Sequence, residues 1–193
     1  LSLNEIMEGL SLQLITYLLA LSKTKDTKDL LPAAMMYIYL HGRPKSISVP
    51  PNGIPHAKEK ENTNGIFLND PDVLRTLDSQ SGTDDGFIGV SYVKDGSVKK
   101  TSPVLTAEEF EALKALTEKT LIRLYSRLES GEIAIHPVKN GTLSPCSYCP
   151  YRSICRFDPA LPENSFDYIS KVSDKTIREK LDEEMKRNGK ENL

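Results

Sequence analysis

The sequence lacks any long apolar run. The longest one, residues 14–21, is interrupted by Thr16, whereas a helix that crosses a bilayer needs roughly 20 apolar residues. The N-terminus also lacks the basic stretch followed by an apolar stretch that marks a signal peptide. We therefore expect no membrane association for this chain.

Cysteine is scarce as well, with three in 193 residues, and all three lie within residues 146–155. Such a cluster argues against a disulfide framework spread over the fold, and a reducing compartment fits it better. We expect a cytoplasmic protein. The net charge of −2 neither favours nor excludes nucleic acid, because a local basic face can bind DNA on an acidic chain.

Familiar catalytic motifs are missing too. The sequence has no glycine-rich phosphate loop. Its histidines stand alone and suggest no triad: His41, His56 and His136. The carboxylate pairs at 70 and 72 and at 84 and 85 suit helix caps and solvated loops. The residues of this chain, taken by themselves, do not predict a complete active site.

What is present predicts an α/β fold. Apolar content of 38% and charged content of 27% are those of an ordinary globular chain, and the length predicts one domain. Residues 3–22 read as one helix, whose buried stripe is Leu10, Leu14, Leu18 and Leu21. Residues 32–40, PAAMMYIYL, read as a strand buried on both faces. Helix followed by strand predicts a sheet with helices packed on it.

The middle of the chain alternates loops with short elements. Residues 41–64 form a long irregular excursion, in which we expect a short edge strand at 46–49. Residues 65–78 predict a turn into a short helix, with Asn69 or Asp70 as the cap and Pro71 in the first helical position. Residues 87–93 and 97–101 flank Lys94-Asp95-Gly96, which predicts a hairpin.

Two helices are expected in the second half. Thr106 with Glu109 three residues later is a capping box, and the helix should run to about Ser130 and stop near Gly131. Its expected core stripe is Phe110, Leu113, Leu116, Thr117, Leu121, Leu124 and Leu128. Its Arg123 and Arg127 share one face, which could be either a solvated surface or a DNA contact. Residues 133–137 should be extended, residues 173–186 should form a charged amphipathic helix, and the last residues should fray.

The cysteines have the spacing of a metal site. Cys146, Cys149 and Cys155 lie in PCSYCPYRSICRF, so one small loop could point three thiolates at a common centre. Zinc and iron–sulfur clusters both suit thiolates, and both normally take four protein ligands. His136 could complete a Cys₃His zinc site, or the fourth ligand could lie on sequence outside this chain. Because the chain begins at Leu1 and enters a helical pattern almost at once, we expect a fragment of a longer protein.

Gln13 and Tyr17 are four residues apart and should lie one turn above each other on a helix. An amide and a phenol placed in this way could grip a phosphate or a base edge. The spacing alone favours the other interpretation, a boundary glutamine and a half-buried tyrosine.

Together these stretches resemble the C-terminal nuclease region of the AddB family, also called RexB, which is the B subunit of the bacterial ATP-dependent helicase–deoxyribonuclease. The resemblance covers nearly the whole chain and is carried in order by GLSLQLITYL, PAAMMYIYL, GIFLNDPDVLRTLD, KDGSVKKTSPVLTAEEFEAL, GEIAIHPV and PCSYCPYRSICRFD. It implies a truncated restriction-endonuclease-like domain, with a mixed sheet flanked by helices and a C-terminal cysteine loop. We expect one domain over residues 1–193, with an α/β core portion at 1–135, the cysteine loop at 136–160 and a helical tail at 161–193.

The resemblance also implies site residues. The family's Q-x-x-x-Y motif matches Gln13 and Tyr17, which would support the active site and the DNA strand. The acidic residue and the D/E-x-K pair that bind Mg²⁺ precede this motif in the family, so the resemblance places them before Leu1 and implies that the fragment alone does not cleave DNA. Cys146, Cys149 and Cys155 match three of the four cysteines that hold a [4Fe–4S] cluster.

The implied partners are DNA and an AddA-type helicase–nuclease subunit, in recombinational repair of double-strand breaks. The isolated fragment could cover an exposed sheet edge by forming a homodimer. The alternative is a zinc-stabilised binding module without nuclease activity.

Overall fold

A three-stranded mixed sheet lies at the centre of the fold. The computed structural model describes residues 1–38, 63–83, 86–162 and 164–191. The strand order is β1-β2-β3, where β1 pairs antiparallel with β2, and β2 pairs parallel with β3. The strands are β1 Ala34–Tyr37, β2 Asn64–Leu68 and β3 Val104–Leu105. The expected mixed sheet flanked by helices is therefore confirmed.

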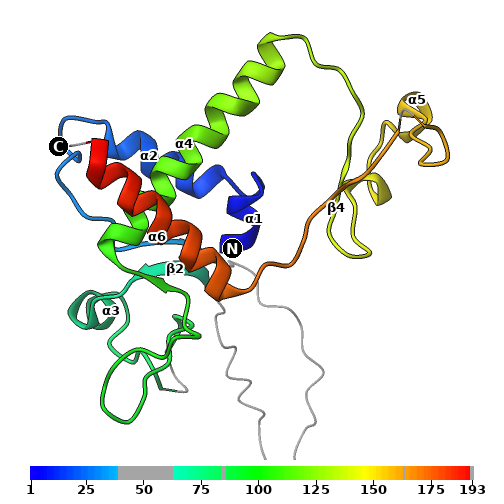
Figure 1. Ribbon diagram of the computed structural model, residues 1–193. Helices are drawn as coiled ribbons and strands as arrows, with labels where there is room; N and C mark the ends of the chain where they lie inside the picture. Colours follow the sequence, from blue (N-terminus) through cyan, green and yellow to red (C-terminus); the bar gives the residue numbers. More distant parts are fainter. Residues whose placement is uncertain (39–62, 84–85, 163, 192–193) are drawn as a thin grey trace, which may run out of the picture.

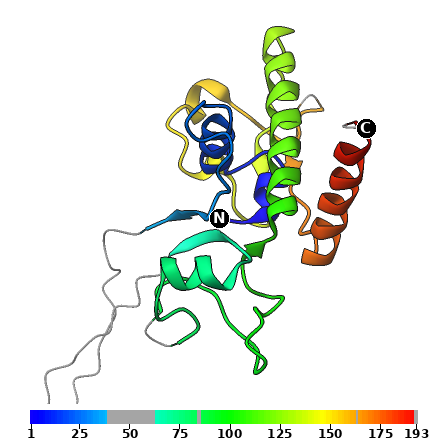
Figure 2. The same cartoon turned by 90° about the vertical axis from the view of Figure 1, so that its left-hand side faces the viewer.

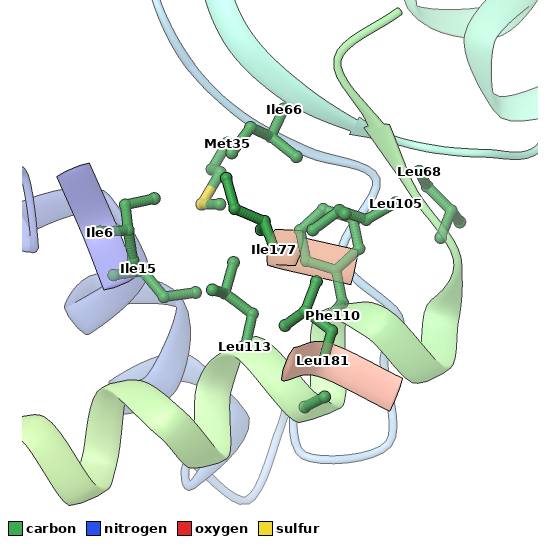
Figure 3. Packing of buried hydrophobic residues seen from close by; sticks show 11 residues of the cluster. Ile6, Ile15, Met35, Ile66, Leu68, Leu105, Phe110, Leu113, Ile177 and Leu181 are labelled. Atoms are coloured by element: carbon green, nitrogen blue, oxygen red, sulfur yellow. The ribbon is translucent and has the colours of Figure 1, made fainter. Parts of the chain in front are cut away.

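The central strand β2 has a hydrophobic core on each face. Ile66 and Leu68 belong to one cluster of buried side chains and Phe67 to another, because successive side chains of a strand point to opposite faces. Figure 3 shows Met35 and Ile66 of the sheet meeting the side chains of the helices in the first cluster. The buried members of that cluster are Ile6, Ile15, Met35, Ile66, Leu68, Leu105, Phe110, Ala112, Leu113, Ile177 and Leu181.

Helices cover both faces of this sheet (Figures 1 and 2). Four of them contribute to the first cluster, and the short α3 contributes Leu74 to the second. The helices are α1 Leu3–Met7, α2 Gln13–Ser22, α3 Pro71–Leu77, α4 Ala107–Glu129, α5 Arg152–Cys155 and α6 Asp174–Glu191. Among the described residues, no helix is long and apolar enough to span a membrane.

The expected single helix at 3–22 is broken in two. Gly9 has φ +82° and Ser11 has φ +51°, and these left-handed conformations end α1 and separate it from α2. The break changes which leucines are buried: Ile15 is fully buried, whereas Leu21 is 53% exposed. The predicted leucine stripe was therefore wrong at its C-terminal end.

The strand buried on both faces is β2, not the segment at 32–40. Within the described part of that segment, residues 32–38, a strand forms at residues 34–37; this strand, β1, lies at the edge of the described sheet and has one buried side chain, Met35. Residues 65–68, expected as a turn, form most of β2. The edge strand expected at 46–49 lies outside the described residues.

The predicted hairpin shrinks to a single bridge. Tyr92 and Val98 form an isolated antiparallel bridge around the turn at Gly96, which has φ +85°. In the described part of the chain, the segments on either side form no strand beyond this bridge. The turn signal was correct, and the predicted strands were wrong.

Helix α4 begins as predicted but leaves the core halfway. The Thr106 side chain accepts from the backbone N–H of Glu109, and the Glu109 carboxylate accepts from the backbone N–H of Thr106, so the capping box is confirmed. Phe110 and Leu113 are fully buried, whereas Leu128 is 76% exposed. Figures 1 and 2 both show the C-terminal half of α4 projecting beyond the other helices. The predicted core stripe holds only for the first half.

The C-terminal helix α6 packs along α4 and completes the first core cluster with Ile177 and Leu181. It continues to Glu191, beyond the expected end at residue 186. Among the described side chains, ion pairs of Arg178 with Glu109 and of Glu184 with Lys119 tie it to α4. Helix α6, which lies within the segment expected as a tail, thus contributes to the packed core.

Candidate functional site

The Gln13–Tyr17 pair lies on the solvent side of α2. Gln13 Nε2 donates a hydrogen bond of 3.2 Å to the phenol oxygen of Tyr17. Both side chains are exposed, with Tyr17 at 57%. Ile15, between them in sequence, is fully buried and holds this helix against the core. The helix thereby presents the amide and the phenol outward, as one hydrogen-bonded unit.

This geometry excludes a half-buried tyrosine at a core edge. The Tyr17 phenol still has its own O–H to donate, and the Gln13 amide keeps its carbonyl oxygen as an acceptor and a second N–H as a donor. Such groups can hold a phosphate oxygen, a water molecule or a base edge. The pair can therefore orient a polar ligand, but it supplies no general base and no metal.

The described residues contain no group of three or more His, Cys, Asp or Glu side chains that could hold a metal ion. In the first of the two carboxylate pairs, Asp70 is the N-cap of α3. Its Oδ1 accepts from the backbone N–H of Asp72 at 2.9 Å and of Val73 at 3.1 Å. The second pair, at 84 and 85, lies outside the described residues. The described part of the chain therefore does not build a magnesium site by itself.

The three cysteines lie in a small substructure, which we call the cysteine lobe and define as residues 138–168. A two-stranded parallel sheet closes its base, pairing β4 Val138–Lys139 with β5 Asp167–Tyr168. Between these strands lie a 3₁₀ turn, Pro145–Ser147, and α5. Figure 1 shows the lobe to one side of the helices and sheet of the main body.

The local structure explains where each thiol lies. The Ser144 side chain caps the 3₁₀ turn by accepting from the backbone N–H of Cys146, and α5 ends at Cys155. Cys146 and Cys149 are partly buried, Cys155 is exposed, and all three are free thiols. They are the right donors for zinc or iron, but the described residues do not gather them into a metal-binding group. The lobe as described does not fit a complete cluster.

His136 does not join the cysteines. Its Nδ1 lies 2.9 Å from the Ser165 hydroxyl, and the ring is partly buried. No metal-binding group within the described ranges includes this histidine. The described residues thus give no support to the Cys₃His zinc site considered from the sequence.

An aromatic cluster supports the base of the lobe, and the sequence patterns did not predict it. The Phe166 ring packs edge-on against Phe157 at 4.8 Å and against Tyr168 at 6.0 Å between ring centroids. Lys139 Nζ lies over the Phe166 and Tyr168 rings, at 4.7 and 5.8 Å from their centroids, a cation–π arrangement. The signal was the apolar–polar–apolar pattern Phe166-Asp167-Tyr168, which is typical of a short strand.

A bidentate ion pair lies at the C-terminal end of α4, before the lobe begins. Arg127 donates from Nε to Glu132 Oε2 at 2.7 Å and from Nη2 to Oε1 at 2.5 Å. These hydrogen bonds lower the pKa of Glu132 and raise that of Arg127. Arg127 is thus engaged within the chain, although its side chain is exposed, like that of Arg123 on the same face.

Comparisons with known proteins agree with this architecture. The sequence profile described as the PD-(D/E)XK nuclease superfamily matches residues 2–156. The B subunit of the ATP-dependent helicase/deoxyribonuclease of Bacillus licheniformis is 31% identical, over 98% of this chain and 17% of its own length. The protein of the same name from Bacillus subtilis is 31% identical over 95% of this chain and 16% of its own length, and that from Clostridium kluyveri is 34% identical over 91% and 16%.

The chain thus spans about a sixth of the length of the curated relatives it matches. The profile covers both the exposed Gln13–Tyr17 pair and the cysteines. These comparisons confirm the resemblance seen in the sequence and speak against a zinc module of unrelated origin. The chain belongs to the PD-(D/E)XK nuclease superfamily.

Proposed function

We propose that this chain is part of the nuclease domain of an AddB-type subunit of an ATP-dependent helicase–deoxyribonuclease. The observation that carries the proposal is the hydrogen-bonded Gln13–Tyr17 pair, presented to solvent by α2 in a chain of this nuclease superfamily. In the full-length protein the activity is hydrolysis of DNA phosphodiester bonds during repair of double-strand breaks. Because the described residues contain no metal-binding group of their own, we expect the 193-residue chain by itself not to cleave DNA.

Gln13 and Tyr17 act as positioning residues in this proposal. The amide and the phenol hold the DNA strand, or the water that attacks it, and their mutual hydrogen bond fixes both rotamers before the strand arrives. Preorganised polar groups of this kind lose little entropy on binding and keep the reacting atoms aligned. Removing one group should therefore lower the rate of cleavage without unfolding the domain.

Two cofactors complete the proposal. Mg²⁺ would be held by carboxylates of the full-length protein, and it would stabilise charge on the phosphate and help to form hydroxide. Cys146, Cys149 and Cys155 supply three ligands of a [4Fe–4S] cluster, and a cysteine elsewhere in that protein supplies the fourth. The cluster is structural and fixes the lobe against the rest of the domain.

The partners follow from the names of the relatives. A B subunit of a helicase/deoxyribonuclease implies an AddA-type partner, and the substrate is the DNA strand that the complex unwinds in the cytoplasm. The isolated chain forms a homodimer through β1, because this edge strand pairs on one side only within the described sheet and open edges are templates for pairing. Sedimentation as a monomer would refute the dimer.

The nuclease proposal is tested in the full-length protein assembled with its partner. Tyr17→Phe removes only the hydroxyl that accepts from Gln13, and Gln13→Ala removes the donor. Each change should lower the cleavage rate of a single-stranded substrate by tenfold or more. The matched control is Tyr125→Phe, because Tyr125 is also exposed but lies on a different helix, α4. Wild-type cleavage by both site variants would refute the role of this pair.

The cluster proposal has its own readout. Anaerobic purification of the full-length protein should give a brown solution with about four irons per chain. Cys146→Ser should bleach it, whereas Ser147→Ala, at the neighbouring exposed residue, should not. A colourless protein with zinc would refute the iron–sulfur assignment.

A further inference from the structure

We propose that Glu5 and Ser11 are positioning residues for the hydrogen-bonded pair on α2. The hydrogen bond between their side chains fixes the turn from which α2 starts, and so the direction in which this helix presents Gln13 and Tyr17. This inference rests on the proposed function, because it concerns the same site. It adds two side chains that precede α2 and act through its first residue.

Ser11 has an unusual backbone conformation for a residue with a side chain. Its φ of +51° lies in the left-handed region, which glycine enters freely and which a residue with a Cβ atom enters at a cost. Such a conformation persists only where the surrounding contacts fix it, and it is typical of functional sites. The turn already uses a glycine at Gly9, with φ +82°. The serine supplies what a second glycine would lack, a hydroxyl that can donate a hydrogen bond.

This hydroxyl binds back to α1. Ser11 Oγ donates to Glu5 Oε2 at 3.1 Å, and the backbone N–H of Leu10 donates to the Glu5 carbonyl at 2.7 Å. Glu5 therefore holds two consecutive residues of the turn, one through its backbone and one through its side chain. The turn is tied to the helix that precedes it, and its left-handed residue is fixed in place.

The start of α2 depends on this turn. Its N-cap residue, Leu12, makes no side-chain hydrogen bond to the helix, so the usual local device that fixes the first turn of a helix is missing. Ile6 of α1 and Ile15 of α2 are buried in the same core cluster, and Figure 3 shows both side chains directed into it. The core thus fixes how deeply α2 is buried, and the turn fixes the path by which the chain enters it.

The pair on α2 is sensitive to that path. Gln13 is the first residue of α2 and lies two residues after Ser11, so a loosened turn displaces its amide first. The amide is also the donor of the 3.2 Å hydrogen bond to Tyr17. Because a displacement of about 1 Å at a positioning group is enough to slow a reaction strongly, the bond between Glu5 and Ser11 contributes to cleavage without touching the DNA.

The experiment measures cleavage of a single-stranded substrate by the full-length protein assembled with its partner. Ser11→Gly keeps the left-handed backbone accessible and removes the hydroxyl, whereas Glu5→Ala removes the acceptor. Each change should lower kcat about fivefold, the weight of one ordinary hydrogen bond, and leave KM unchanged. Glu5→Gln keeps an acceptor oxygen and should cleave at the wild-type rate.

A cycle of combined variants separates positioning from a simple loss of folded protein. In a background that carries Gln13→Ala and Tyr17→Phe, the pair is gone, so adding Ser11→Gly should lower the rate no further. If Ser11→Gly merely reduced the folded fraction, the losses would multiply in this background as well.

The hairpin turn around Gly96 provides a matched control. There Ser97 Oγ donates to Asp95 Oδ1 at 2.7 Å, in an equally exposed serine–carboxylate hydrogen bond on another segment of the chain. Asp95→Ala should therefore leave cleavage unchanged, which shows that loss of a surface hydrogen bond alone does not slow the enzyme.

Three results would overturn this inference while the proposed function stands, because Tyr17→Phe alone still slows cleavage. The first is wild-type cleavage by both Ser11→Gly and Glu5→Ala. The second is a multiplied loss when Ser11→Gly is added to the background without the pair. The third is an equal loss in Glu5→Gln and Glu5→Ala, which would exclude the hydrogen bond as the cause. Wild-type cleavage by Tyr17→Phe and Gln13→Ala would instead overturn the role of the pair, and this inference with it.

Discussion

The ion pair between α4 and α6 leads to a prediction with an unusual asymmetry. The Glu184 side chain is only 3% exposed, whereas its partner Lys119 is 47% exposed. The other basic group near this carboxylate, Arg187, lies 3.9 Å away and is 66% exposed. Lys119→Ala should therefore leave a buried carboxylate without its main partner, a change that is far more costly than the loss of a surface pair.

The magnitude follows from the burial of each partner. Breaking a fully buried pair on one side costs about 3–5 kcal/mol. Since solvent screens the Lys119 end, we expect about 2 kcal/mol for Lys119→Ala, or a fall in Tm of roughly 5 °C for a chain of this size. Adding Glu184→Met removes the buried charge at similar volume, so the double variant should recover more than half of the loss.

Urea unfolding followed by circular dichroism measures all of these values. Lys175→Ala is the matched control, because its pair with Glu179 on the same helix is 3.8 Å long and largely exposed. That change should cost less than about 0.5 kcal/mol. The reasoning is refuted if Lys119→Ala costs no more than this control, or if adding Glu184→Met lowers stability further.

Three further perturbations follow from the structure. A Cβ added in Gly65→Ala would lie 2.5 Å from the Cβ of Met36 on the neighbouring strand, so we expect a loss of about 1–3 kcal/mol by urea titration; unchanged stability would contradict the register of β1 and β2. Asp70→Ala removes the cap of α3 and should cost about 1 kcal/mol, whereas Asp70→Asn should cost much less; equal losses would show that the cap is not the cause. Hydrogen bonds from Arg127 lower the pKa of Glu132 from its ordinary value of 4.5. The ionised carboxylate therefore stabilises the folded state at pH values above 4.5. This contribution is lost as the pH falls through the lower pKa of the folded state. Glu132→Gln should flatten this part of the curve of urea midpoint against pH, and an unchanged curve would refute the contribution.

Local signals in the sequence predicted local structure well. The capping box at Thr106 and the cap at Asp70 were both correct, because these residues bond to backbone groups two or three positions away. The break at Gly9 and Ser11 was missed, because the leucine spacing continues across it and periodicity does not report backbone conformation. The pattern of residues 32–40 was apolar enough for a central strand, yet burial depends on the number of neighbouring strands, which no local pattern contains.

The candidate site shows the same limit. The spacing of Gln13 and Tyr17 predicted that they share a face, and the structure adds that this face is turned to solvent. The cysteine spacing predicted a common centre, and this stays a prediction: the described residues contain no group of three or more His, Cys, Asp or Glu side chains that could hold a metal ion. The cluster of Phe157, Phe166 and Tyr168 was missed because Phe157 comes from a different segment than the other two rings.

The length of the projecting half of α4 sets the position and the direction from which the chain continues toward the cysteine lobe. The helix is 23 residues long and spans roughly 35 Å at 1.5 Å per residue, with its first half fixed in the core by Phe110 and Leu113. Each residue inserted in the exposed half would swing the point where the lobe is attached by about 100° and advance it by about 1.5 Å. The length of this helix thus sets the direction in which the lobe is attached: a single insertion would turn the lobe aside, whereas an insertion of about seven residues, close to two full turns, would nearly restore its direction.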